Sequence, residues 1–414
     1  MEEVNERRRK LMSRDLVALK KVVELLPIEG ADNIELARVE NTGWKLVVPK
    51  GDFKVGDIGI LFEIDSAIEA CDQLGFLGKP RKYPCPAKQC EVSVYVIKTK
   101  MLRGVVSQGL LVKPELFGLP QTASYNPSQL AQILHVHHVD TLVAAKGSNG
   151  ITPTKLPWFV PHTDQQRIDA NLSLFDTEQE REFCVEEKAD GSSMSVFYVD
   201  KSFYADRFGV TSHNNLLRRN KISWLEEFRH EHGGSIRLSD LGALVVAGIK
   251  HLLHRDKVRY AYTDNMFVST ALKLNLEVIM ERAHRLTGRN LVYQGELVGP
   301  GIQGNRNSHS GRHWLLFDIY DIDKQRYMLP EERMTFYWEY LYPHVEAVKC
   351  ISRHRTVLSE FTNADAMQQL ANVQTAKGNM AEGVVVKSES YPYVSFKCVS
   401  REYLLRGGHR DNRK

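Results

Sequence analysis

Hydrophobic and polar positions alternate in short runs between Leu16 and Pro120. The runs ELARVE, GWKLVVP, VSVYVI and VVSQGLLV have the two-residue period of β-strands, and Gly51, Gly56 and Gly59 fall between strands as turn residues. Several short strands joined by such turns in about 100 residues favour a small barrel or sandwich, of which an OB-like barrel is one form. The pattern predicts an N-terminal OB-like β-barrel.

The second half of the chain combines strand-like runs with helical periodicity. Strands are indicated by SMSVFYVD, KSFYADRFGVTSHN, LVYQGELVGPGIQG, HWLLFDIYDI, EGVVVKSE and YVSFKCVS. Between residues 221 and 289, apolar residues recur at helical spacing, as in WLEEFRH and ALKLNLEVIMERAHRL. The predicted fold class is therefore α+β, with a barrel followed by a larger domain of strands and helices.

Residues 121–157 have the composition of a connector. Within it, the HVHHVD segment invites a metal interpretation through His135, His137, His138 and Asp140. However, adjacent histidines point to opposite faces of a strand, and no second ligand pair at zinc spacing follows. The three cysteines upstream, Cys71, Cys85 and Cys90, lack a downstream pair in the same way. A structural role is favoured for both groups.

Composition indicates the number of domains, the net charge and the cellular compartment. The chain has 414 residues, 43% of them hydrophobic, which is enough for two or three domains of roughly 100–200 residues. With 55 basic and 51 acidic residues the net charge is +4, so a nucleic-acid partner would be met by local basic patches. No apolar run approaches the ~20 residues of a membrane helix, and MEEVNERRRK is not a signal peptide. Six scattered cysteines suit reduced thiols, so an intracellular protein of the cytoplasm or nucleus is expected.

Basic residues gather in two parts of the predicted barrel, with aromatic residues near them in sequence. The basic residues are Lys79, Arg81, Lys82 and Lys88, then Lys98, Lys100 and Arg103; the aromatic ones are Trp44, Phe53 and Tyr95. OB barrels use such residues to follow a phosphate backbone and to stack bases. Solvated strand faces and core aromatics would give the same composition, and both interpretations stay open at this stage.

The stretch VEEKADGSSMSVFYV, residues 185–199, places Lys188 two residues before Asp190 at the entrance to a strand-like run. Later apolar runs each contain a charged residue: Glu296, Asp318, Glu382 and Lys397. An unpaired buried charge is very unfavourable, so these residues need partners. Several of them in one chain suggest a common site.

Nucleotidyl transfer through a lysine–AMP adduct is a reaction that would use such a set. A lysine amine attacks phosphorus only when unprotonated, so its pKa must fall from about 10.4. A divalent metal and a second lysine at the phosphates would lower this pKa and neutralise charge as pyrophosphate leaves. Carboxylates would hold the metal and a ribose hydroxyl, and an aromatic ring could cover the adenine. The chain supplies Lys188, Asp190, Glu296, Phe317, Glu382 and Lys397.

An ordered series of short segments resembles the covalent nucleotidyltransferase superfamily of ATP-dependent ligases and capping enzymes. The series is EKADGSS (motif I), FGVTSHN (Ia), YQGELVGPGIQGN (III), FDIYDI (IIIa), AEGVVVK (IV) and SFKCVS (V). Within the superfamily, the segments IKTKMLRGVVSQGLLV, PHTDQQRI and SFKCVSREYLLR resemble the fifth RNA ligase family, of the Deinococcus and Naegleria type. The resemblance covers about residues 15–407.

The resemblance implies a role for each matching residue. Lys188 would be the nucleophile adenylylated by ATP, and Lys397 would contact the α-phosphate. Glu187 would lie beside the adenine and Phe317 would stack on it, while Arg167 would contact the nucleotide and its phosphates. The remaining residues, Asp190, Glu296 and Glu382, would surround a divalent metal and the ribose, with manganese preferred over magnesium.

Two positions depart from the pattern of the relatives. Ser212 is followed by His213, where many relatives have Ser-Arg. Ser395 stands where many ligases have a second lysine, two places before the motif V lysine. Lys387 is the candidate for supplying charge near that position.

The implied function is that of an ATP-dependent RNA ligase that joins a 3′-OH to a 5′-phosphate in RNA repair, with RNA at least on the 3′-OH side. The expected partner is RNA or a nicked RNA/DNA duplex, with no membrane, and the protein is expected to be a monomer. The predicted division is an OB-fold nucleic-acid-binding domain (1–120), a linker (121–150), a nucleotidyltransferase domain (151–407) and a basic tail (408–414). The second domain would be an ATP-grasp-like adenylation domain of antiparallel sheets with helices.

Two other functions compete with this one. An mRNA-capping guanylyltransferase would carry its OB domain after motif V, where this chain has only residues 398–414. A non-catalytic RNA-binding protein with a ligase-like domain would not need the intact charged series, and labelled ATP would distinguish it.

Overall fold

The computed structural model describes residues 15–85, 90–120, 124–144, 154–217, 225, 228, 237–253, 265–305, 307–361, 363–374 and 378–405. Residues 1–14, the expected basic tail, Lys88 and parts of the helical stretch 221–289 lie outside these residues.

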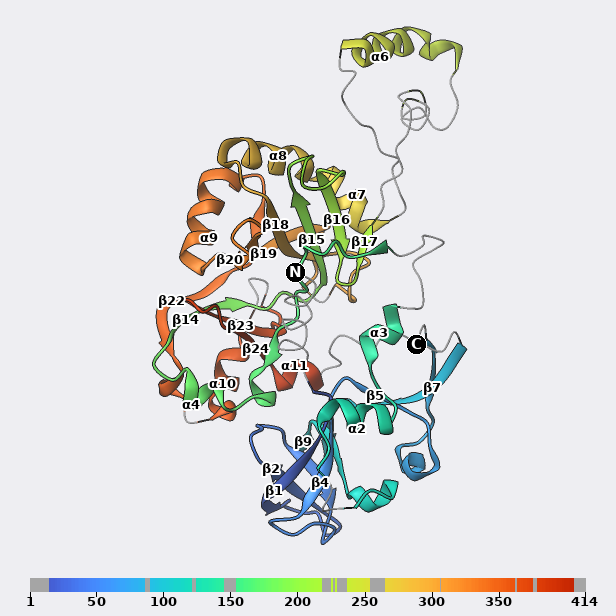
Figure 1. Ribbon diagram of the computed structural model, residues 1–414, viewed down its shortest axis with the longest axis vertical. Helices are drawn as coiled ribbons and strands as arrows, with labels where there is room; N and C mark the ends of the chain where they lie inside the picture. The colour runs from blue at the N-terminus through green and yellow to red at the C-terminus, as the bar shows by residue number, and fades with distance from the viewer. Residues whose placement is uncertain are drawn as a thin grey trace.

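The N-terminal part is a β-barrel of the OB type, as the alternation predicts. One sheet has the order β10-β4-β1-β2-β3 and a second the order β11-β5-β7-β6 (Figure 1). The strands of the first are β1 (Val17–Pro27), β2 (Ile34–Val39), β3 (Leu46–Pro49), β4 (Ile58–Glu63) and β10 (Gly109–Val112). Those of the second are β5 (Ser66–Glu69), β6 (Arg81–Cys85), β7 (Cys90–Val96) and β11 (Val136–His138). The hairpin β8 (Lys100–Leu102) and β9 (Val105–Ser107) completes this part.

The barrel aromatics are core residues. Trp44, Phe53 and Tyr95 are 0%, 4% and 8% exposed, and the Trp44 indole Nε1 donates to Glu63 Oε1 at 2.9 Å. The interpretation of these rings as base-stacking residues is therefore wrong. Their alternation with polar neighbours reflects the inner face of the barrel, where large rings pack.

Residues 127–144 fold against the barrel. They form α2 (Pro127–Ile133), β11 and α3 (Val139–Ala144). Asn126 begins α2 with a capping box, because its side chain accepts from Gln129 N while the Gln129 side chain accepts from Asn126 N. In the HVHHVD segment, His137 Nε2 lies 2.8 Å from Glu69 Oε1 on the neighbouring strand.

The larger part contains two sheets. One runs β12-β17-β16-β15-β18-β19-β20, with β21 paired to β19, and the other runs β13-β24-β23-β14-β22. The strands of the first are β12 (Thr154–Lys155), β15 (Ser192–Tyr198), β16 (Phe208–Ser212), β17 (Asn215–Leu217), β18 (Leu291–Val298), β19 (His313–Asp321), β20 (Arg326–Tyr327) and β21 (Glu346–Ala347). Those of the second are β13 (Gln166–Arg167), β14 (Glu182–Glu187), β22 (Cys350–Val357), β23 (Gly383–Ser388) and β24 (Ser395–Val399).

Several helices pack against the two sheets. The α-helices are α4 (Leu174–Thr177), α6 (Leu241–Leu253), α7 (Met266–Lys273), α8 (Leu276–Thr287), α9 (Pro330–Phe336), α10 (Ala364–Ala371) and α11 (Arg401–Leu405). A π-helical turn, η5 (Tyr337–Leu341), follows α9 directly, and short 3-10 turns are η1 (Asp72–Leu77), η2 (Pro114–Phe117), η3 (Ile168–Ala170), η4 (Leu238–Asp240) and η6 (Leu358–Glu360). Helices α7 and α8 lie beside the large sheet, whereas α6 stands apart from both sheets (Figure 1). None of the helices in the described part of the chain is long and apolar enough to span a membrane.

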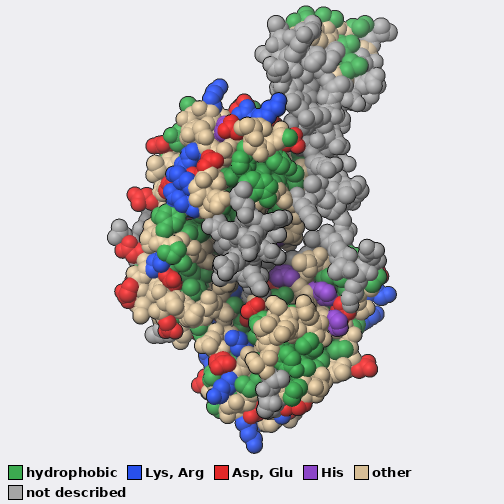
Figure 2. Space-filling model, viewed as in Figure 1, with side chains coloured by type: hydrophobic (Ala, Val, Ile, Leu, Met, Phe, Trp, Pro, Cys, Tyr) green, Lys and Arg blue, Asp and Glu red, His purple; other side chains and the backbone are tan. Residues whose placement is uncertain are grey.

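Polar contacts join the barrel to helices α10 and α11 of the second domain. Arg401 donates to Gln108 Oε1 of the barrel at 3.0 Å and to Asp169 Oδ1 at 2.9 Å. Lys45 of the barrel lies 3.2 Å from Asp365. Basic and acidic side chains are mixed over both halves of the visible face, as the near balance of charge predicts (Figure 2).

Candidate active site

Lys188 lies where the chain crosses from one sheet to the other. It follows the last residue of β14 in the small sheet, and four residues later β15 begins in the large sheet. Its backbone N donates to Gly383 O at 2.9 Å. A Cβ on Gly191 would lie 2.3 Å from Leu297 O, so only glycine lets this turn pack against β18. The path of the turn thus explains the glycine of the Lys-x-Asp-Gly pattern.

Glu382 is the direct partner of Lys188. Lys188 Nζ lies 2.6 Å from Glu382 Oε2, and the two side chains are 19% and 4% exposed. Burial favours a neutral amine, but the charges of Glu382, Glu296 and Asp190 outweigh it and raise the pKa of Lys188 above its ordinary value. The ammonium form is therefore stabilised in the absence of nucleotide.

The three carboxylates reach this lysine from three strand ends. Asp190 follows Lys188 in the same turn, Glu382 precedes β23, and Glu296 lies on β18, where it pairs in register with Ser193. Asp190 and Glu382 are buried, at 8% and 3% exposure. All three carboxylates act on the charge of Lys188, and carboxylate oxygens are the ligands that hard divalent cations prefer.

Arg167 and Lys397 are cross-strand partners. The short strand β13 runs parallel to β24 and places the two residues in register. Burial, followed by the charges of Lys188 and Arg167, lowers the pKa of Lys397 to about 8. Arg167 Nη2 also lies 3.7 Å from Asp65 Oδ2 of the barrel. The pair, with Arg167 buried and Lys397 half-buried, forms a cationic side to the site.

A buried ion network lies behind Phe317. Lys387 Nζ is 2.8 Å from Glu186 Oε2 and 3.1 Å from Asp318 Oδ1, and it donates to Phe317 O at 2.6 Å. Arg333 pairs with the same two carboxylates. Lys387 stands directly opposite Ser395 in the β23–β24 register, but its ammonium is occupied by this network. Asp318 is expected from the sequence to share a site with Glu296, Glu382 and Lys397, but it belongs to this buried network instead.

The Phe317 ring is half-buried and lies 5.5 Å from Lys387 Nζ. The network holds the backbone carbonyl of Phe317, because both Lys387 and Arg333 donate to Phe317 O. Glu187, the last residue of β14, is half-buried, and burial raises its pKa against the opposing charge of Lys349. Glu186 and Arg333 carry no local signal in the sequence, since their partners are remote along the chain.

The basic residues expected to contact nucleic acid belong to a barrel hairpin. Lys98 precedes β8 and is half-buried, whereas Lys100 on β8 and Arg103 in the following turn are exposed. Arg103 has φ of 49°, which fits the tight turn between β8 and β9. The hairpin belongs to the barrel, whereas Lys188 lies in the turn between β14 and β15.

His213 follows β16 and contacts the segment that leads into β13. Its Nδ1 lies 3.2 Å from Thr163 Oγ1, and its Nε2 lies 3.4 Å from Asp164 Oδ2. Burial raises the pKa of Asp164, but the hydrogen bond and charge of His213, with the charge of Lys397, hold it well below its usual range. In the sequence, the segment PHTDQQRI stands out only through the family resemblance, which does not predict the contact of Asp164 with His213.

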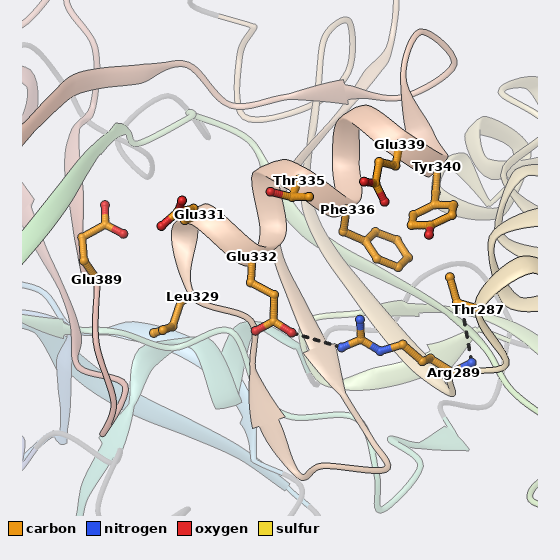
Figure 3. Close-up of a pocket in the computed structure, with 10 residues that line it drawn as sticks. All are labelled: Thr287, Arg289, Leu329, Glu331, Glu332, Thr335, Phe336, Glu339, Tyr340 and Glu389. Carbon is orange, nitrogen blue, oxygen red and sulfur yellow. Dashed lines mark hydrogen bonds and ion pairs between the residues drawn. The ribbon is translucent and has the colours of Figure 1, made fainter.

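A separate pocket of about 610 Å³ opens beside α9 in the second domain (Figure 3). It is lined by Thr287, Arg289, Leu329, Glu331, Glu332, Thr335, Phe336, Glu339, Tyr340 and Glu389. Arg289 pairs with Glu332 at 3.3 Å across it. It contains none of the residues expected at the nucleotide site.

An OB-fold domain joined to a two-sheet domain that buries a lysine among carboxylates is the architecture of a polynucleotide ligase. Residues 181–399 match the RNA ligase family, and residues 16–114 match an OB-fold domain. The chain belongs to the RNA ligase family.

Solved structures of Naegleria gruberi RNA ligase resemble the whole chain. An apo mutant is 27% identical, with a TM-score of 0.71, covering 94% of this chain and 97% of that one. A mutant with AMP and Mn is also 27% identical, with a TM-score of 0.71 and coverages of 94% and 98%. The ligase with PPi is 28% identical, with a TM-score of 0.70 and coverages of 95% and 98%. No curated protein sequence matches the chain. These findings confirm the predicted family and the α+β fold class.

Proposed function

We propose that this protein is an ATP-dependent RNA ligase that seals a 3′-OH to a 5′-phosphate through a lysyl-AMP intermediate on Lys188. The observation that carries the proposal is the 2.6 Å contact between Lys188 Nζ and Glu382 Oε2, in a turn that Asp190 and Glu296 also approach. RNA is required at least on the 3′-OH side, and a nicked RNA or RNA/DNA duplex is the proposed substrate. The enzyme acts as a monomer in RNA repair.

The proposed nucleotide is ATP and the proposed metal is manganese, in preference to magnesium. Solved Naegleria gruberi RNA ligase structures contain AMP and Mn or ATP and Mn. The donor set supports a divalent ion here, because the charges of Asp190, Glu296 and Glu382 raise the pKa of Lys188. An ion held by these carboxylates would offset their charge and so favour the neutral, nucleophilic amine.

In the first step, the Lys188 amine forms a bond to the α-phosphorus of ATP as the bond to pyrophosphate breaks. Lys397 and Arg167 face the phosphates and stabilise the charge that develops on them. Phe317 stacks on the adenine, and Glu187 lies beside it. AMP then passes from Lys188 to the 5′-phosphate of the RNA. The 3′-OH finally attacks that phosphate, which forms the phosphodiester and releases AMP.

The two domains divide this work. We propose that residues 1–120 bind nucleic acid, that 121–150, of which 127–144 fold against the barrel, connect the domains, that 151–407 perform the AMP chemistry and that 408–414 form a basic tail. The proposed division of labour is supported by the separation of the exposed hairpin residues Lys100 and Arg103 from the buried cluster at Lys188.

A nick-sealing assay tests the function. Full-length protein with Mn²⁺ and ATP is expected to seal a duplex nick that has RNA on the 3′-OH side, and to fail with GTP. Labelling of the protein by GTP instead of ATP would favour a capping guanylyltransferase. Binding of the nicked duplex without labelling by either nucleotide would favour a non-catalytic RNA-binding protein.

ATP affinity is expected to fall as the pH rises through about 8, where Lys397 loses its proton. The charged form of Lys397 binds phosphate, so affinity should decline by up to about tenfold per pH unit above that pKa. Binding of an ATP analogue with a non-cleavable α,β bridge measures this without turnover. In Lys397→Arg the side chain stays charged, so affinity for the analogue should not decline between pH 7 and 9. An equal decline in Lys397→Arg would refute the role of Lys397.

Charge reversal at Lys98, Lys100 and Arg103 is expected to weaken binding of nicked duplex and to flatten its salt dependence. Each lost phosphate contact should change the log–log slope by about one unit. Labelling of the protein by ATP should persist, since the hairpin is separate from Lys188. Reversal of Lys50 and Lys54, which are exposed elsewhere on the barrel, is the matched control. Unchanged affinity and slope in the hairpin variant would mean that these residues only solvate the barrel.

A further inference from the structure

Two histidines and an aspartate form a cluster beside the proposed phosphate contacts. His162 and Asp164 precede β13, and His213 follows β16, so the cluster joins two segments about 50 residues apart in sequence. One potential ligand atom from each residue lies within 4.8 Å of the others. Among the described residues, this is the one group of three or more His, Cys, Asp and Glu side chains with such spacing.

The distance between two of the donors matches that of ligands on a shared ion. Zinc binds imidazole nitrogen and carboxylate oxygen at about 2.1 Å, which places two donors of a tetrahedral ion about 3.4 Å apart. His213 Nε2 and Asp164 Oδ2 are 3.4 Å apart. The His162 ring lies 5.7 Å from the His213 ring between centroids, and a nitrogen of His162 lies within 4.8 Å of the ligand atoms of the other two residues.

Hydroxyl groups orient the His213 ring. Thr163 Oγ1 lies 3.2 Å from His213 Nδ1 and 2.7 Å from Ser193 Oγ on β15. When the Nδ1 proton is donated to Thr163, the neutral ring presents the lone pair of Nε2 toward Asp164. A histidine that binds metal through one nitrogen commonly donates a hydrogen bond from the other, which holds the ring in place.

We propose that His162, Asp164 and His213 form a second metal site, which binds a divalent transition-metal ion of the zinc class. Two imidazoles and one carboxylate suit such ions, whereas the all-carboxylate cluster at Lys188 suits a harder ion. The Asp164 side chain is 55% exposed, so an ion can reach the site from solvent. The site does not depend on the proposed reaction, although an ion there would add positive charge on the Lys397 side.

Zinc binding by nucleotide-free protein tests the proposal. Full-length protein is stripped with a chelator and titrated with Zn²⁺ by calorimetry, and with Co²⁺ by the visible absorption of a tetrahedral ion. One equivalent should bind. Asp164→Asn and His213→Ala should each weaken this binding by at least about 100-fold, more than loss of an outer hydrogen bond does.

Two variants serve as controls. His137→Ala removes another histidine–carboxylate pair, with Glu69 at 2.8 Å, and Asp190→Asn alters the proposed catalytic metal site; both should retain the ion. Asp164→Asn is nearly isosteric at an exposed position, so it tests the site even if His213→Ala does not fold. The proposal is overturned if wild-type protein binds no zinc, if both cluster variants bind it normally, or if Asp190→Asn alone abolishes binding.

Discussion

Lys188→Ala is expected to lower adenylylation by ATP about a thousandfold or more, to background, and to abolish nick sealing with it. The reason is that no other group can form the covalent intermediate once the nucleophile is removed. Labelling with radioactive ATP and Mn²⁺ measures the first effect, and sealing of a 5′-phosphate nick measures the second. On a nick that already carries AMP on its 5′-phosphate, the variant should recover part of its activity, because Lys188 acts before that point.

The Lys188→Ala variant needs one control for correct folding and another that shows which lysine is labelled. The substitution removes the partner of the buried Glu382, so its thermal unfolding should be compared with that of Lys188→Met, which keeps more of the side-chain volume. Lys201→Ala changes an exposed lysine in the turn after β15 and should label normally. Full labelling of a folded Lys188→Ala protein would show that the nucleophile lies elsewhere.

Alanine at Asp190, Glu296 or Glu382 is expected to lower adenylylation by about 100- to 1000-fold each, as loss of an electrostatic contact in the transition state does in other enzymes. The three residues serve one cation and one lysine, so a double variant should be little worse than the worse single one. Single-turnover labelling at saturating Mn²⁺ measures these rates.

Two further variants make the test specific. Glu382→Gln isolates the effect of charge, and Glu331→Ala controls for the loss of any carboxylate. Glu382→Gln keeps the shape of the side chain and removes its charge, so it should resemble Glu382→Ala if charge is what matters. Glu331 is exposed on α9 beside the separate pocket, and its substitution should have no effect. Labelling of Glu382→Ala near the wild-type rate would refute the role proposed for that carboxylate.

The alternation of apolar residues predicts most strands, because one side of each strand must be buried. The segments carrying Lys188, Glu296 and Lys397 are β-strands or their ends, as their patterns indicate. Alternation does not say what an aromatic residue on a buried face is for. Trp44 and Tyr95 near basic residues are compatible with base stacking, and only the folded barrel shows them to be core.

Partners that are remote along the chain could not be predicted. Lys387 in an apolar strand indicates a buried charge, but not that Glu186 and Asp318 hold it. The register of Arg167 with Lys397 depends on a two-residue strand whose parallel pairing leaves no periodic signal. The His213 contact with Asp164 joins two loops, where local sequence carries little geometric information.

Mapping the AMP adduct tests the central proposal most directly. Protein incubated with ATP and Mn²⁺ is digested under alkaline conditions, which preserve a phosphoramidate, and its peptides are analysed by mass spectrometry. The account predicts one AMP per chain, on Lys188, stable to alkali and released by acid. AMP on any other residue, or sealing by protein that forms no adduct, would contradict it.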